Sequence, residues 1–205
     1  HANAFGSEPN MVVTVVGTNT GQSSYAAKLY LDTAAGSFSS NIDEIVVQGE
    51  QTYRAAFYQG RGTVLTTKVT LEGGTFGVSG GTGNQYSAGE IALKTGTTST
   101  FNKASGYATW YQGYDGSSYT GQITGDGRLR VDGYNSNDSG LRIYGNNTYT
   151  GGTYLNRSTN EDMIYVGRPG QTTPLGTGAV ELQTDSDTKV VFTLAANIEL
   201  ANDIR

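Results

Sequence analysis

The stretch Gly140–Leu182 reads GLRIYGNNTYTGGTYLNRSTNEDMIYVGRPGQTTPLGTGAVEL, and it is the part of the chain that decides the fold. Within it, apolar residues alternate with other residues in short runs, and each run ends in Gly, Asn or Pro. Alternation with a period of two is typical of a strand with one buried face, whereas Gly, Asn and Pro favour turns. The stretch therefore predicts short strands joined by compact turns. The alternating apolar pairs are Leu141 and Ile143, Ile164 and Val166, and Val180 and Leu182.

Comparable apolar pairs recur along the chain at a nearly constant interval. Pairs begin at Ile45, Val69 and Ile91, which are 24 and 22 residues apart, and Ile164 follows Leu141 by 23 residues. Self-similarity at an interval of about 20–50 residues indicates a repeat architecture. No heptad or 3.6-residue apolar stripe of useful length competes with this pattern. We therefore expect an all-β fold in which the chain coils on itself.

The composition excludes several kinds of protein. The chain has 205 residues, which suffices for one domain or for a solenoid of several turns. Its net charge is −5 and its 13 Lys and Arg residues are scattered, which argues against nucleic acid as a partner. Cysteine is absent, which excludes disulfides and thiolate chemistry, and the single histidine, His1, cannot support a catalytic triad. No run approaches the roughly 18 apolar residues of a membrane helix, so we expect no membrane insertion by this chain.

Two blocks of sequence resemble a known family. NNTYTGGT at 146–153 and LGTGAVEL at 175–182, with ITGDGRL at 123–129, are similar to the autotransporter-associated β-strand repeat. The resemblance extends over about residues 119–204. It implies a right-handed parallel β-helix, displayed outside a bacterial cell or on its surface, as in the passenger regions of secreted surface proteins. The repeat of this family has no catalytic residues to carry over.

The chain is expected to have two parts. Residues 1–24 form an N-terminal arm or capping strand, and residues 25–205 form the β-helix, interrupted by an aromatic-rich excursion at 106–121. MVVTVV at 11–16 is apolar on both faces, so we expect it to be buried on both sides or paired with another strand. QTYRAAFY at 51–58 is interpreted as strand or loop rather than helix.

The excursion holds the clearest candidates for a binding site. GYATWYQGYDGSSYTG at 106–121 contains four tyrosines and the only tryptophan of the chain. Aromatic side chains with a polar tip are enriched at protein interfaces, and they also suit sugar-binding faces. Three interpretations stay open: a protein–protein interface, a glycan contact, and rings that only cover the flank of the solenoid. The candidate residues are Tyr107, Trp110, Tyr111, Tyr114 and Tyr119.

Carboxylates offer weaker hypotheses. Parallel β-helices also host polysaccharide-cleaving enzymes, and Asp115, Asp126 and Asp132 are the candidate acid–base groups. Each of them precedes a glycine, however, and Asp-Gly favours a turn. Asp185 and Asp187 provide too few oxygen ligands to predict a calcium site. We therefore expect no catalytic residue, no metal site and no cofactor.

The function expected from the sequence is that of a non-enzymatic, extracellular structural β-solenoid in a bacterial surface fibre or layer. The chain ends without an amphipathic capping helix, and the apolar N-terminal hexamer would be adhesive if it were exposed. Head-to-tail contact between unlike ends would cover both, so we expect the protein to bind copies of itself. The alternatives are an adhesin that binds glycans or a host surface, and a polysaccharide-cleaving β-helix enzyme. The candidate assembly strand comprises Met11, Val12, Val13, Val15 and Val16.

Overall fold

The computed structural model describes most of the chain. The described residues are 9–17, 27–31, 36–37, 41–49, 55–60, 62–78, 83–103, 108–132, 140–156, 163–182, 191–195 and 197–205. Within them the structure is all-β, so no helix is present that could cross a membrane.

The strands form three parallel sheets, which we name A, B and C. Sheet A is ordered β1 (Met11–Val16), β4 (Ile42–Gln48), β7 (Lys68–Glu72), β10 (Ile91–Leu93) and β13 (Ile123–Gly125). Sheet B is ordered β2 (Ala27–Leu31), β5 (Ala55–Gln59), β8 (Thr75–Val78), β11 (Thr98–Lys103), β14 (Arg128–Asp132), β16 (Thr153–Asn156) and β18 (Val180–Leu182). Sheet C is ordered β3 (Gly36–Ser37), β6 (Thr63–Leu65), β9 (Gly83–Ser87), β12 (Ala108–Gln112), β15 (Leu141–Ile143), β17 (Met163–Val166) and β19 (Val191–Leu194).

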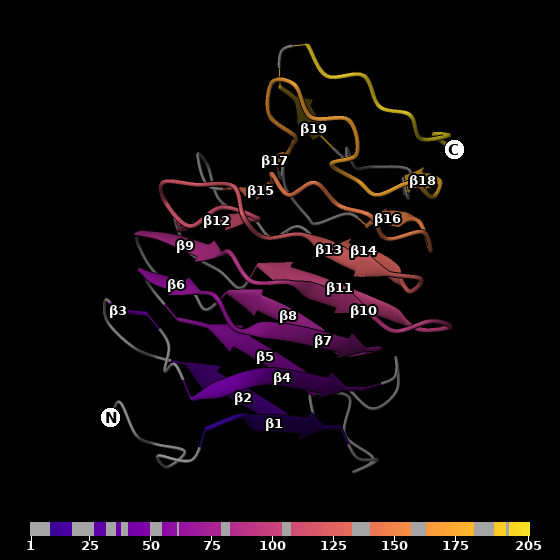
Figure 1. Ribbon diagram of the computed structural model, residues 1–205. Coiled ribbons are helices and arrows are strands. Elements are labelled where there is room, and N and C mark those ends of the chain that lie inside the picture. The colour runs from indigo at the N-terminus through magenta and orange to yellow at the C-terminus, as the bar shows by residue number, and fades with distance from the viewer. Residues whose placement is uncertain are drawn as a thin grey trace.

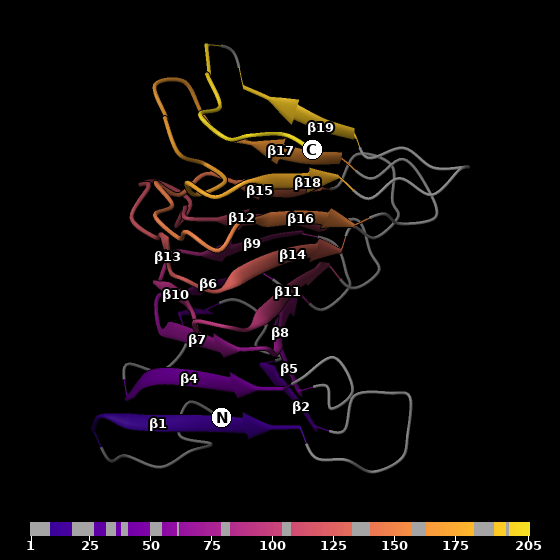
Figure 2. The ribbon, with the colours of Figure 1, turned by 90° about the vertical axis from the view of Figure 1, so that its right-hand side faces the viewer.

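This arrangement is a parallel β-helix, as the sequence predicts. The chain visits sheets A, B and C in turn, and each strand pairs in parallel with its counterpart in the next coil (Figure 1). Seen from the side, the strands of successive coils lie one above another (Figure 2). The predicted interval is confirmed by the register, because Val69 pairs with both Ile45 and Ile91. Likewise, Leu141 pairs with Ile164.

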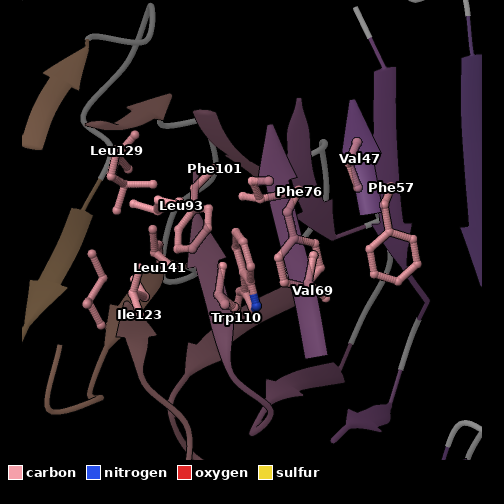
Figure 3. Packing of buried hydrophobic residues seen from close by; sticks show 14 of the residues in the cluster. Val47, Phe57, Val69, Phe76, Leu93, Phe101, Trp110, Ile123, Leu129 and Leu141 are labelled. Atoms are coloured by element: carbon pink, nitrogen blue, oxygen red, sulfur yellow. The ribbon is translucent and has the colours of Figure 1, made fainter. Parts of the chain in front are cut away.

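The core consists of inward side chains stacked from coil to coil. Phe57, Phe76 and Phe101 occupy one register position of sheet B, and Trp110 approaches them from sheet C (Figure 3). The ring centroids of Phe57 and Phe76 lie 5.2 Å apart, and those of Phe101 and Trp110 lie 4.9 Å apart. We call these four residues the inner aromatic stack. Because all four are fully buried, their contribution is to stability.

Beyond β13, irregular segments take the place of sheet A strands, and this explains the NNTYTGGT block. The backbone N–H of Thr148 donates to the Ile123 carbonyl at 2.8 Å, so the block continues the stacking. Asn147 and Tyr149 point inward and are fully buried. The Asn147 side-chain oxygen accepts from the Ile123 N–H at 2.7 Å, and its amide donates to the Pro174 carbonyl at 2.6 Å. The block therefore links three consecutive coils.

The N-terminal hexamer is the terminal strand of sheet A. Val13 and Val15 pair with Ile45 and Val47 of β4, which confirms the predicted pairing. Burial on both faces is wrong, since Val12 is 53% and Val16 is 47% exposed. Of the two alternatives for residues 1–24, β1 fits a capping strand rather than a separate arm. Residues 55–59 of the 51–58 segment form strand β5, in agreement with the strand interpretation.

Candidate functional site

The outer face of sheet C carries a column of large side chains. Tyr86 of β9 pairs with Tyr111 of β12, Tyr111 with Arg142 of β15, and Arg142 with Tyr165 of β17. Adjacent parallel strands lie about 4.8 Å apart, so side chains at one register position are in contact along the coil axis. The Tyr86 and Tyr111 rings are accordingly stacked, with centroids 5.2 Å apart and an interplanar angle of 21°.

A long loop covers this face. In earlier coils, sheet C connects to sheet A through residues 66–67 or 88–90, whereas residues 113–122 join β12 to β13. Gly113 begins the loop at φ +82°, and its Cα lies against the backbone of Gly145, where a Cβ would come within 2.4 Å of the Gly145 nitrogen. Only glycine tolerates both conditions, so the loop leaves the strand in a fixed direction.

A tight turn holds the middle of the loop. The Asp115 carboxylate accepts hydrogen bonds from the backbone N–H groups of Ser117 and Ser118 at 2.7 and 2.6 Å. The Tyr114 hydroxyl donates to the Gly116 carbonyl at 2.8 Å. The hydrogen bonds from Ser118 and Ser117 lower the pKa of Asp115 by stabilising its ionised form. Asp115 therefore has the turn role that its Asp-Gly sequence predicts.

The loop returns two tyrosines onto the sheet. Tyr114 and Tyr119 stack on each other with centroids 4.7 Å apart. Tyr114 also lies 5.9 Å from Tyr111, and Tyr119 lies 5.8 Å from Tyr144, which follows β15. Tyr119 is 46% exposed, and the other rings of the group are half-buried. We call this group the tyrosine surface: Tyr86, Tyr111, Tyr114, Tyr119 and Tyr144.

Two arginines lie at the edge of the tyrosine surface. The Arg142 guanidinium is 4.1 Å from the Tyr165 ring centroid and 5.6 Å from that of Tyr111. The Arg168 guanidinium is 4.2 Å from the Tyr119 ring centroid. Cations at such distances are attracted to the negative face of an aromatic ring. The outer face of sheet C therefore joins flat aromatic rings to fixed positive charge.

The protonation states of this face are set by its packing. Desolvation raises the pKa of Tyr111, although Arg142 opposes the shift. Desolvation and the neighbouring Tyr119 raise the pKa of Tyr114. Desolvation acts to lower the pKa of Arg142, but its hydrogen bond to the Tyr144 hydroxyl and the nearby phenols outweigh this and raise it. At neutral pH the rings are thus uncharged and the guanidinium is charged.

The sequence-based candidates divide into three groups. Tyr111, Tyr114 and Tyr119 come together on the tyrosine surface, whereas Tyr107 lies outside the described residues. Trp110 is the correction: it is 0% exposed and belongs to the inner aromatic stack, so it is not available for contact with a partner. The expected excursion is also shorter, because residues 108–112 form the regular strand β12.

Sequence reasoning missed half of the face. Tyr86 and Tyr144 belong to the tyrosine surface, and Arg142 and Arg168 border it. The repeat interval was the available signal, since Tyr86, Tyr111, Arg142 and Tyr165 share one register position. The connections between strands vary in length, however, and the sequence spacings of these residues are therefore unequal.

The other candidate carboxylates have structural partners. Asp126, in the corner between β13 and β14, accepts from the Thr150 hydroxyl at 2.8 Å. Asp132, at the end of β14, accepts from the Arg130 guanidinium at 2.6 Å and from the Asn156 amide at 2.9 Å. His1, Asp185 and Asp187 lie outside the described residues. Among the residues that are described, no three His, Cys, Asp or Glu side chains are grouped so as to hold a metal ion.

An open hollow near the ends of β1, β4 and β7 offers less chemistry than the tyrosine surface. Its charged groups are Glu72 and Lys94, which pair with each other at 2.8 Å. The Gln48 amide also donates to the Glu72 carboxylate at 3.1 Å. Since these groups satisfy one another, the hollow presents no polar group that calls for a ligand.

Comparisons of this chain with protein-family models, with curated proteins and with solved structures found no match. The resemblance to the autotransporter-associated repeat therefore stays a prediction.

Proposed function

We propose that this protein is a non-enzymatic, extracellular β-solenoid of a bacterial surface, whose tyrosine surface binds carbohydrate. The observation that carries the proposal is the packing of five tyrosines from three coils and one pinned loop on a single outer face. The resemblance to the autotransporter-associated repeat supports the cellular location.

The chemistry of the face suits sugars. One side of a pyranose ring presents C–H groups that pack on an aromatic ring, and its hydroxyls accept and donate hydrogen bonds at the phenolic edge. Rings held by a β-ladder lose little conformational freedom on binding, which favours affinity. Tyr119 is the most exposed of the five rings and stacks on Tyr114, so it is the expected central contact.

A glycan array probed with the purified chain tests the proposal. Tyr119→Ala should weaken binding to the best glycans about tenfold, which corresponds to roughly 1.4 kcal/mol. The matched control is Tyr30→Ala, because Tyr30 is a 52% exposed tyrosine that stacks on Tyr58 at 5.0 Å, on sheet B. Absence of any glycan binding, or equal losses in the two variants, would contradict the proposal.

Self-assembly is the second candidate function. In the described part of the chain, β1 pairs with β4 on one side and has no strand on the other. Its outward residues Val12 and Val16 are exposed. An unpaired strand edge is a template for a strand of another molecule, so we propose head-to-tail contact of copies through β1.

Electron microscopy of two variants tests the second candidate. Removal of residues 1–16 deletes the edge strand, and Val12→Lys combined with Val16→Lys keeps the strand but adds charge to it. Filaments of the unaltered chain should disappear in both variants. Filaments that persist in either variant, or an unaltered chain that stays monomeric at high concentration, would refute assembly through β1.

A further inference from the structure

The two arginines beside the tyrosine surface differ from the other described arginines in having no acidic partner. Arg128 pairs with Glu181, Arg130 pairs with Asp132 at 2.6 Å, and Arg205 pairs with Asp203. No carboxylate forms an ion pair with Arg142 or Arg168 among the described residues.

Both guanidiniums also have an unmet hydrogen-bonding requirement. The Nε atoms of Arg142 and Arg168 are buried and have no hydrogen-bond partner. A buried donor of a charged group without a partner destabilises a structure by more than a neutral one does. The carboxylate nearest in the loop, that of Asp115, accepts the N–H groups of Ser117 and Ser118. Partners for the two arginines must therefore come from outside this face.

The two positive charges are unexpected in this chain. The net charge is −5, so a pair of unneutralised arginines on one face does not follow from the overall composition. Arg142 lies on β15, and Arg168 follows β17 in the next coil. Because successive coils repeat at about 4.8 Å, the two guanidiniums follow one another along the coil axis with tyrosine rings beneath them.

We propose that this face binds an acidic polysaccharide, with the carboxylates of its sugars on Arg142 and Arg168 and a sugar ring on Tyr119. This inference rests on the proposed carbohydrate-binding function and narrows it to a ligand class. The planar guanidinium fork matches a carboxylate with two hydrogen bonds. Its position on a tyrosine face leaves the outer edge of the guanidinium for the ligand. A linear polymer with one carboxylate per sugar can reach both arginines at once.

A matched pair of ligands tests the proposal. The probes are oligogalacturonate and the same oligomer with its carboxylates methyl-esterified, titrated against the full chain by calorimetry. We expect the acidic form to bind at least tenfold more tightly, and its affinity to fall as salt is added. Arg142→Gln and Arg168→Gln should each remove most of this preference while the thermal midpoint stays unchanged.

Arg130→Gln is the control variant. Arg130 also lies over a tyrosine ring, 5.9 Å from the centroid of Tyr154, but Asp132 already neutralises it. Its replacement should leave the preference for the acidic oligomer intact. An equal loss in Arg130→Gln would show a general charge effect and would overturn the assignment of the two arginines.

The remaining outcomes separate the inference from the function beneath it. If both oligomers bind equally, the acidic preference is wrong and carbohydrate binding stands. If polyaspartate competes as well as oligogalacturonate does, the face recognises charge and not sugar, and the inference is overturned. If neither oligomer binds and the glycan array is empty, the proposed function itself fails.

Discussion

Two aromatic clusters lie on opposite faces of the same coil. The inner aromatic stack of Phe57, Phe76, Phe101 and Trp110 is fully buried, whereas the tyrosine surface is partly open to solvent. Trp110 and Tyr111 are adjacent residues of β12, and one belongs to each cluster. The β-ladder that aligns core residues therefore also aligns surface residues, and rigidity of the core is passed directly to the surface.

The comparison predicts its largest effect at Trp110. Trp110→Ala should lower the free energy of unfolding by about 3–5 kcal/mol, because it opens a cavity in the inner stack. It also removes the indole N–H that donates to the Ser87 hydroxyl at 2.7 Å. Tyr111→Ala, one residue along the strand, should cost only about 1–2 kcal/mol. Urea unfolding of both variants is the measurement, and similar losses would show that the two faces contribute equally to stability.

The next effect should arise at the glycine that aims the loop. Gly113→Ala should destabilise the fold by about 1–3 kcal/mol and weaken glycan binding, since the new Cβ meets the Gly145 backbone. Gly96→Ala is the matched control, because Gly96 has φ +75° but nothing lies within 4 Å of its Cβ position. The control should incur only the backbone penalty and bind glycans normally. If both variants bind alike, Gly113 does not position the tyrosines.

The sequence predicts the coil better than it predicts the surface. The 22–24-residue interval and the period-two alternation follow from stacking and pleating, which are local and repeated. In ATWYQ, by contrast, Trp110 and Tyr111 are both large aromatic residues, so alternation alone cannot assign the inward one. The register with neighbouring coils decides it: Trp110 shares its position with Leu141, which is buried. Arg142 reaches Tyr111 only through this register, over an irregular spacing in sequence.

A smaller effect of opposite sign is expected inside the core. Gln85 is the register partner of Trp110 and is 0% exposed, yet neither atom of its amide has a hydrogen-bond partner. Replacement of an unsatisfied buried amide by an apolar group of similar size removes a desolvation penalty. Gln85→Leu should therefore raise the free energy of unfolding by about 1 kcal/mol.

The control for Gln85→Leu is the same substitution at Gln59. Gln59 is equally buried, but its amide donates to the Thr63 and Tyr86 carbonyls at 2.9 and 3.0 Å and accepts from the Ser87 hydroxyl at 2.8 Å. Gln59→Leu should thus be destabilising. If both substitutions destabilise the protein to the same extent, the Gln85 amide is satisfied in solution.

The smallest effect should appear at alkaline pH, and it separates the surface from the core. The folded-state pKa of Tyr111 is raised, so its contribution to stability is complete below its unfolded value of about 10 and is lost as the pH rises through the folded value. The urea midpoint should therefore fall between pH 9 and pH 11. The fall should be smaller in Tyr111→Phe, because the other tyrosines, including the buried Tyr149, titrate in both proteins. An identical fall in the two proteins would show that Tyr111 ionises as freely in the folded state as in the unfolded state, and that the tyrosine surface is more hydrated than its packing indicates.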